Sequence, residues 1–421
     1  MPSGVISSLY FGFTKAMMKA LNLFGDPIGK FSASPDLLTF AKRLKKTAVQ
    51  KSITGILFSS DHLVCSEVMK SSHWLSRPLA ERLYLATGTS DPQVVHPFLD
   101  SIIALDGPDQ RRIKKVMHTV FTSNAIDSWR ESSEKIVQRL IDEVRDKKEF
   151  DFVEAFANPL PLEVICEIIG VPEDYKEQCN QWGRALGGIG LDLPTNNKEL
   201  RELEEAATGL TSLIAQLLNQ RKKEPKEDLL SVMLAANSDG EILTDKEVIA
   251  SAAFTLIAGF ETTMNLLSVG TLALLEHPDQ ARELVQNPSL LSNFLEEALR
   301  VSSPIQFTVR TADTEQILPD GTVAKKGQSI ILNLAAANRD PKIFEDPDNF
   351  DIHRSNSKKN VSFGFGAHHC IGSLLARVEA EVMWRELLKA FPDTGSWKLM
   401  GKPIYRSSKT IRSLDQLLMK F

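Results

Sequence analysis

Apolar residues recur at helical spacing over most of the chain, and this pattern predicts a mainly helical protein. From about residue 106 to 236 the helical pattern is almost continuous, and prolines divide it into separate helices. The longest predicted helix begins at Thr244, because Thr244 and Glu247 make a Thr-x-x-Glu capping box, and it ends near His277. A further helix is expected over residues 287–302.

Shorter runs with strand-like patterns predict β-rich parts at about 45–60, 305–340 and 402–417, the last of them a closing hairpin. These strands cluster instead of alternating with helices, which argues against a doubly wound parallel sheet. We therefore expect a mainly α (α+β) protein. Its large helical lobe would take in about 106–302 and 371–391, and the β-rich parts would form a smaller lobe.

A glycine-rich stretch, residues 187–194, interrupts the helical pattern. We expect a flexible connection between two helices there, because glycine and proline disfavour regular structure. Two interpretations remain open: a lid over a binding site, or an ordinary surface loop.

Composition narrows the classes of function. The chain has 421 residues, 43% of them hydrophobic, and a net charge of -5, as in an ordinary soluble globular protein whose main partner is not nucleic acid. Its four cysteines are widely spaced, which excludes a Cys-x-x-Cys zinc or redox pair and favours a reducing, cytoplasmic location. No run of 18 or more apolar residues occurs, so we expect no transmembrane anchor.

The stretch Ser362–Gly372 carries the first candidate chemistry. Three glycines surround a single cysteine, Cys370, and a helical pattern follows at once. Free N–H groups at a helix N-terminus would favour a thiolate there, and a thiolate is a soft metal ligand. The alternative is a glycine turn with an inert buried cysteine.

The stretch Ala258–Thr263, in the middle of the longest predicted helix, is the second candidate for a chemical role. Gly259, two threonines and the acid Glu261 all disfavour a buried apolar helix, which marks a functional or strained site. Thr262 can turn its hydroxyl back to the carbonyl of Ala258 and bend the helix. The alternative is a helix that merely reaches the surface here.

Several motifs, taken together, resemble the cytochrome P-450 family. The run Phe363–Gly372, which reads Phe-Gly-x-Gly-x-His-x-Cys-x-Gly, resembles the family's haem-binding loop. Ala258–Thr263 resembles its oxygen-binding motif, and Glu297-x-x-Arg300 with Arg354 resembles its buried charge triad, which is structural. The resemblance implies one cytochrome P-450 domain over residues 1–421, with haem between the long helix and the cysteine loop.

The resemblance also implies roles for individual residues. Cys370 would be the axial ligand of the haem iron, Thr262 would assist oxygen activation, and Glu261, with Ala258 and Gly259, would belong to the proton-delivery route. Further residues expected to bind the cofactor are Phe363, Gly364, Gly366, His368, Gly372, Arg310, Gln110 and Lys114. The last two stand where relatives usually have His and Arg, so their contact with the haem propionates is left open. Expected substrate-pocket residues are Phe254, Ile305, Gln306, Phe307 and Ile411.

The implied function is a soluble bacterial-type monooxygenase that inserts one atom of O2 into a lipophilic small molecule. Haem b would be the cofactor, and electrons would come from NAD(P)H through a separate ferredoxin and reductase. We expect the enzyme to be a monomer. The basic run 111–115 is either a docking patch for that acidic donor or a solvated helix face. Two rival functions are a peroxygenase of the same fold, which uses hydrogen peroxide, and a non-catalytic haem- or gas-binding protein.

Overall fold

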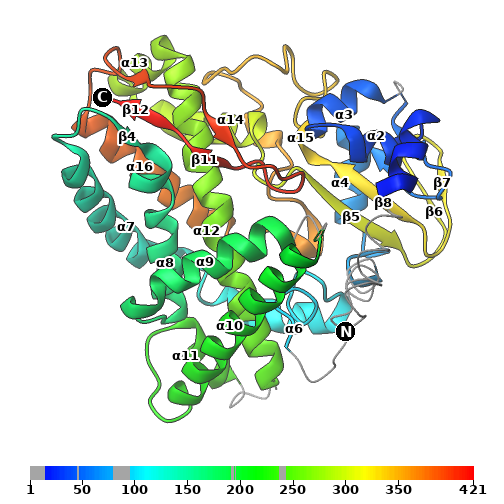
Figure 1. Ribbon diagram of the computed structural model, residues 1–421, viewed down its shortest axis with the longest axis horizontal. Coiled ribbons are helices and arrows are strands. Elements are labelled where there is room, and N and C mark those ends of the chain that lie inside the picture. The colour runs from blue at the N-terminus through cyan, green and yellow to red at the C-terminus, as the bar shows by residue number, and fades with distance from the viewer. Residues whose placement is uncertain (1–14, 45–46, 79–94, 191–193, 195, 237–242) are drawn as a thin grey trace.

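The computed structural model describes residues 15–44, 47–78, 95–190, 194, 196–236 and 243–421. Helices dominate the arrangement, and a smaller sheet with its own helices lies to one side (Figure 1). This arrangement confirms the predicted mainly α fold with a β-rich lobe.

Helix α12 (Asp245–Glu276) passes through the helical lobe (Figure 1). Thr244 caps it, and the reciprocal bonds between Thr244 and Glu247 confirm the predicted capping box. It packs against α8 (Pro159–Ile169), α10 (Asn197–Arg221), α14 (Leu291–Val301) and α16 (Ser373–Ala390). Helix α12 is also apolar and long enough to cross a membrane, but 78% of its most apolar window is buried inside the protein, as in the core helix of a globular domain.

The remaining helices belong to both lobes. They are α2 (Pro27–Ala33), α3 (Leu37–Arg43), α4 (His62–Lys70), α6 (Gly107–His118), α7 (Ser123–Val144), α9 (Lys176–Ala185), α11 (Leu229–Ala235), α13 (Pro278–Gln286) and α15 (Leu334–Ala337). Of these, α2, α3, α4 and α15 lie beside the main sheet (Figure 1). Two short π-helical turns, η1 (Val153–Ala157) and η3 (Leu186–Gly190), lie next to α8 and α9. Turns of this kind often occur at functional sites.

The main sheet has the order β1-β2-β8-β5-β3. Its strands are β1 (Val49–Lys51), β2 (Leu57–Ser59), β3 (Trp74–Leu75), β5 (Phe307–Ala312) and β8 (Ser329–Asn333), and only β2 and β8 pair in parallel. Smaller pairings involve β4 (Phe150–Asp151), β6 (Gln316–Ile317), β7 (Val323–Ala324), β9 (Lys398–Leu399) and β12 (Leu418–Lys420). All three predicted β-rich ranges therefore contain strands.

The chain ends in the predicted hairpin. Strand β10 (Ile404–Tyr405) pairs antiparallel with β11 (Leu414–Gln416) within the predicted range 402–417. The prediction for residues 187–194 was wrong in its first half, because the glycines continue α9 as the π-helical turn η3. Residues 191–193 lie outside the described part of the chain.

Candidate active site

One face of α12 stays open in the middle of an otherwise buried helix. Nearly every residue from Val248 to Leu272 is buried, but Phe254, Ala258, Gly259 and Thr262 keep exposed surface. Phe254, Ala258 and Thr262 are four residues apart, so they lie on the same side of the helix and form one stripe, with Gly259 beside it. We call the solvent-accessible space along this stripe the α12 hollow.

Thr262 lies on this stripe. Its hydroxyl donates a hydrogen bond to the carbonyl of Ala258 (2.7 Å), as the sequence analysis expected, while the helix continues unbroken to Glu276. Gly259 has a packing reason as well: a Cβ there would lie 2.8 Å from the side chain of Ile165 on α8. Glycine therefore lets α8 approach the helix beside the threonine.

Glu261 points to a different side of α12 and is fully buried. Its Oε1 accepts a hydrogen bond from Nη1 of Arg406, which follows β10, whereas its Oε2 is buried and has no hydrogen-bond partner among the described residues. Burial raises the pKa of Glu261 to about 7, although the Arg406 and Arg184 cations act in the opposite direction. Such a carboxyl group can both take up and release a proton near neutral pH.

The cysteine loop is shaped by backbone conformations that favour glycine. Gly364 and Gly366 have φ angles of 65° and 68°, which L side chains rarely adopt. A Cβ at Gly366 would also lie 2.5 Å from the carbonyl oxygen of Met69, at the end of α4. The Cys370 N–H closes the loop on the Phe363 carbonyl (3.0 Å), and the Phe363 ring lies under the Arg377 guanidinium (4.5 Å to the ring centroid).

Cys370 is exposed, whereas Cys65, Cys166 and Cys179 are buried. Desolvation by the surrounding protein nevertheless raises the pKa of the Cys370 thiol, despite the Gly372 N–H and the Lys114 and Arg377 cations. The expected thiolate is therefore not favoured by the protein alone, because burial outweighs the helix terminus. A metal cation reverses this balance, since a coordinating thiol is deprotonated.

Two predicted cationic residues lie together beside the loop. His368 Nε2 contacts Asp106 Oδ1 (3.0 Å), and Asp106 also contributes to the charge environment of Arg310. Burial lowers the pKa of Arg310 to about 10, and no carboxylate of the described residues lies within ion-pair distance of it. Arg310 Nη1 instead donates to Thr308 Oγ1 (2.8 Å) and the Val309 carbonyl (2.7 Å). Sequence reasoning missed Asp106, since an acid before a Gly-Pro helix start reads as an N-cap.

Gln110 and Lys114 contact the cysteine loop from α6. Gln110 Nε2 donates to the carbonyl of Ala367 (2.8 Å), and Lys114 Nζ donates to the carbonyls of Ala367 (2.7 Å) and His369 (2.8 Å). These bonds hold the loop backbone. Their expected contact with haem propionates stays a prediction.

The three residues of the predicted charge triad lie together in the core. Arg300 donates to both oxygens of Glu297 (2.7 Å each), and Arg354 Nε donates to Glu297 Oε1 (3.0 Å). Arg300 also donates to the carbonyl of Asn338 (3.0 Å), whose side chain bonds Ser362 Oγ (2.9 Å) at the start of the cysteine loop. The triad thus supports the loop through its neighbours.

The predicted pocket residues divide between two environments. Phe254 lies on the open stripe and contacts Phe98 edge to face, with ring centroids 6.0 Å apart. Ile305 and Ile411 pair in an isolated β-bridge. The buried Gln306 amide donates to the Ser303 carbonyl (2.5 Å).

Phe307 does not fit the pocket assignment. Its ring packs edge to face on Phe31 of α2 (5.4 Å between centroids), in the cluster that also contains Val309. Alternate residues of a strand point to the same face, so Phe307 and Val309 face α2 and α3, whereas Thr308 and Arg310 face the opposite side. We therefore remove Phe307 from the expected pocket.

The basic run on α6 is only partly available as a docking patch. Arg112 is bound to Glu247 (2.5 Å) and lies 3.5 Å from Asp109, so it ties α6 to the start of α12. Arg111 and Lys115 are exposed. The patch interpretation therefore rests on these two residues.

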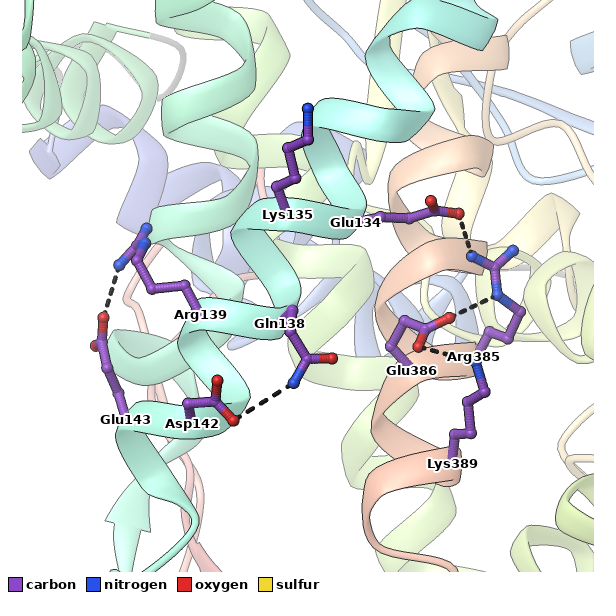
Figure 2. Close-up of a pocket in the computed structure, with 9 residues that line it drawn as sticks. All are labelled: Glu134, Lys135, Gln138, Arg139, Asp142, Glu143, Arg385, Glu386 and Lys389. Atoms are coloured by element: carbon purple, nitrogen blue, oxygen red, sulfur yellow. Dashed lines mark hydrogen bonds and ion pairs between the residues drawn. The ribbon is translucent and has the colours of Figure 1, made fainter.

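A charged surface hollow of about 990 Å³ lies between α7 and α16 (Figure 2). Its side chains pair with one another, as in Arg385 with Glu134 (2.6 Å) and Arg139 with Glu143 (2.7 Å). It adjoins the C-terminal half of α16, about 20 Å along that helix from Cys370. This hollow is separate from the α12 hollow.

The residues fit a haem group. The exposed cysteine on its glycine loop matches an iron ligand. The buried Arg310, which has no carboxylate partner among the described residues, matches an acidic substituent, and the open stripe of α12 matches a flat apolar ring. A fold and site of this kind define a haem-thiolate oxidoreductase.

Comparisons with known proteins lead to the same class of protein. The family model for cytochrome P450 matches residues 89–400. The chain is 37% identical over 318 residues to the polyketide biosynthesis cytochrome P450 PksS of Bacillus subtilis (strain 168), covering 76% of this chain and 77% of that protein. It is 34% identical over 348 residues to 6-deoxyerythronolide B hydroxylase of Saccharopolyspora erythraea, covering 82% and 80%.

Solved structures show the same fold. P450BioI, in complex with acyl carrier protein ligated to hexadec-9Z-enoic acid, matches with a TM-score of 0.80 and 32% identity, covering 89% of this chain and 95% of that one. The chain belongs to the cytochrome P450 family, and it is a haem-thiolate monooxygenase of the bacterial type.

Proposed function

We propose that this protein uses haem b to insert one atom of O2 into a lipophilic small molecule, with electrons from NAD(P)H through a separate ferredoxin and reductase. The observation that carries this proposal is the acid–alcohol pair: Thr262 lies on the open stripe of α12, and Glu261, beside it, has its pKa raised to about 7. A protein that only bound haem would need neither group.

The residues divide the work of holding the cofactor. Cys370 would ligate the haem iron, Arg310 and His368 would meet the acidic substituents of the haem, and Lys114 holds the loop carbonyls. When bound, the thiolate-ligated haem supplies the oxygen-activating chemistry. The protein orients the substrate, excludes water and brings protons.

Proton delivery falls to Glu261 and Thr262. The Glu261 carboxyl lies on the protected side of α12 and exchanges protons near neutral pH, whereas the Thr262 hydroxyl is held on the side of the α12 hollow by its bond to Ala258. A hydroxyl can accept one hydrogen bond while it donates another. Thr262 is thus placed to pass a proton into the hollow.

The substrate class follows from the apolar stripe and from the relatives. Phe254 and Ala258 offer no charge to a ligand, and Ile305 and Ile411 line the same region in the assignment made from sequence. Relatives are named for polyketide biosynthesis, biotin biosynthesis and 6-deoxyerythronolide B hydroxylation. We infer a lipophilic substrate, and a monomeric enzyme in the reducing cytoplasm, where four free cysteines persist.

Electrons would enter on the side of the cysteine loop. Helix α6 is bonded to this loop through Gln110 and Lys114, and it exposes Arg111 and Lys115 beside them. Reversing both exposed charges should slow reduction by a ferredoxin, and the effect should shrink as salt is raised. Reversal of the more distant Lys398 is the control, and equal rates in both variants would contradict this docking site.

The central test is the spectrum of the reduced protein with carbon monoxide. We expect the absorption band of a thiolate-ligated haem in the wild type and its loss in Cys370→Ala, whereas the buried Cys65→Ala control keeps it. Retention of the band in Cys370→Ala would refute the assignment of the ligand.

Turnover separates the proposed reaction from its rivals. The monooxygenase should form product from O2 only when NAD(P)H, a ferredoxin and a reductase are all present. Product formed from hydrogen peroxide alone, and retained after loss of both the Glu261 and Thr262 side chains, would favour a peroxygenase. Haem binding without a product from any lipophilic compound would favour a gas-binding protein.

A further inference from the structure

Arg406 and its neighbours form a line of alternating charges that leads from Glu261 to solvent. Arg406 donates from Nη1 to Glu261 on α12, and from Nε to Asp415 Oδ1 (2.9 Å) across the β10–β11 hairpin. Arg184 on α9 lies 3.6 Å from Asp415 and 3.2 Å from Glu154 of η1. Exposure of the side chains rises from 0% at Glu261 through 16% at Arg406 to 39% at Asp415, so the line opens outward.

The second carboxylate oxygen of Glu261, Oε2, has different surroundings from Oε1. Within the described part of the chain, Oε2 is buried without a hydrogen-bond partner, and it lies against Gly187 of η3, where an added Cβ would be only 1.4 Å away. A Cβ added at the next residue, Gly188, would have only the Arg406 side chain nearby, at a distance of 3.9 Å. The π-helical turn therefore makes room for the carboxyl group at one glycine and not at the other.

We propose that Arg406 is a positioning residue for proton delivery: it holds Oε1 of Glu261 on the hairpin side of α12 and leaves Oε2, in the space beside Gly187, as the oxygen that carries the proton. This inference rests on the proposed function of Glu261. The acid–alcohol motif does not reveal this role of Arg406, because Arg406 lies 145 residues beyond Glu261 in the chain.

The charged groups around Glu261 determine the direction in which its pKa changes when the Arg406 cation is removed. They are Arg406 and Asp415 of the hairpin, Arg184 of α9 and, one step further out, Glu154 of η1. Burial raises the pKa of Glu261 and Arg406 lowers it, so removal of the Arg406 cation raises that pKa above about 7. Above its pKa the carboxyl group is deprotonated and has no proton to give, so the alkaline limb of the pH profile follows this value.

The first test titrates Glu261 directly, without turnover. Infrared difference spectra of the haem-loaded protein, wild type against Glu261→Gln, isolate the band of the protonated carboxyl group. We expect a midpoint of about 7 in the wild type, a midpoint higher by about one pH unit in Arg406→Gln, and recovery in Arg406→Lys. Arg412→Gln, on the same hairpin, is the control and should not move the midpoint.

The second test measures product formed per NAD(P)H consumed. Arg406→Gln should lower this ratio severalfold and move the alkaline limb upward, whereas Arg406→Lys restores both. Gly187→Ala should lower the ratio because the carboxyl group has to move, and the matched Gly188→Ala should not.

The outcomes separate this inference from the proposed function. If Arg406→Gln titrates and couples like the wild type, Arg406 does not position Glu261 and the inference is wrong. If no variant and no wild-type protein forms product while the infrared midpoint still shifts, the ion pair holds and the proposed monooxygenase function fails.

Discussion

Glu297→Gln should destabilise the protein more than any comparable change at an exposed ion pair. Glu297 Oε1 accepts from Arg300 (2.7 Å), Arg354 (3.0 Å) and the Asp351 N–H (3.1 Å), and all three side chains of the triad are nearly inaccessible to solvent. Glutamine keeps the shape but removes the charge and turns an acceptor into a donor. Two guanidinium groups then remain buried without a counter-charge.

The expected cost follows from the burial. Breaking a buried ion pair by removing one partner costs about 3–5 kcal/mol, which lowers the folding equilibrium constant by a factor between about 10² and 10⁴. Asp279→Asn is the matched control, since Asp279 pairs with Arg282 at the same spacing (3.0 Å) but both side chains are exposed. An exposed pair is worth only about 0–1 kcal/mol.

The measurement is urea unfolding of both variants, followed by circular dichroism, together with the rate of haem loss. Because Arg300 is linked through Asn338 to Ser362, Glu297→Gln should also release haem faster. Equal unfolding midpoints for Glu297→Gln and Asp279→Asn would refute the reasoning that the triad is a buried lock.

Three further predictions concern α12, the cysteine loop and α16. Thr262→Val should lower product per NAD(P)H at least about tenfold, whereas Thr255→Val, which removes the same kind of bond (2.7 Å) one face away, should not; similar losses in both would point to helix packing instead. Gly366→Ala should abolish haem retention, measured by Soret absorbance, because φ is 68° and the Met69 carbonyl is 2.5 Å from the new Cβ; normal retention would contradict the close approach. Burial raises the pKa of Glu379 from 4.5 to about 8, so the folded state holds a proton that the unfolded state has lost, and stability should fall as pH rises from 4.5 to 8 by at most about 1.4 kcal/mol per pH unit. Glu379→Gln should flatten this dependence in urea titrations at several pH values, and an unchanged slope would exclude Glu379 as its source.

Local features of the fold were readable from the sequence. The capping box at Thr244 placed the start of α12, and the back-bonding of Thr262 to Ala258 follows from a spacing of four residues. Both depend on neighbours within one turn of helix. The cysteine loop could be predicted for a similar reason. Its backbone has positive φ angles at Gly364 and Gly366, and glycine is the residue that adopts such angles readily.

Partners that lie far apart in the chain were not readable. Arg406 meets Glu261 only because the hairpin folds back on α9 and α12, and its register is set by packing. Asp106 meets His368 across 262 residues in the same way. The family resemblance placed Phe307 in the pocket, but a sequence motif does not say which face of β5 meets α2. The sequence predicted a lowered pKa for the Cys370 thiol, whereas burial raises it, because desolvation depends on all the groups that surround the sulfur.

The close approach of Gly366 to the end of α4 has a consequence for assembly. The cysteine loop is completed by segments from widely separated parts of the chain: α4, α6, the neighbours of Arg300, and α16. Contacts with such large sequence separation form late, because loop closure has to precede them. Haem should therefore be captured near the last step of folding, and its loss should report the first local opening of these contacts around the cysteine loop.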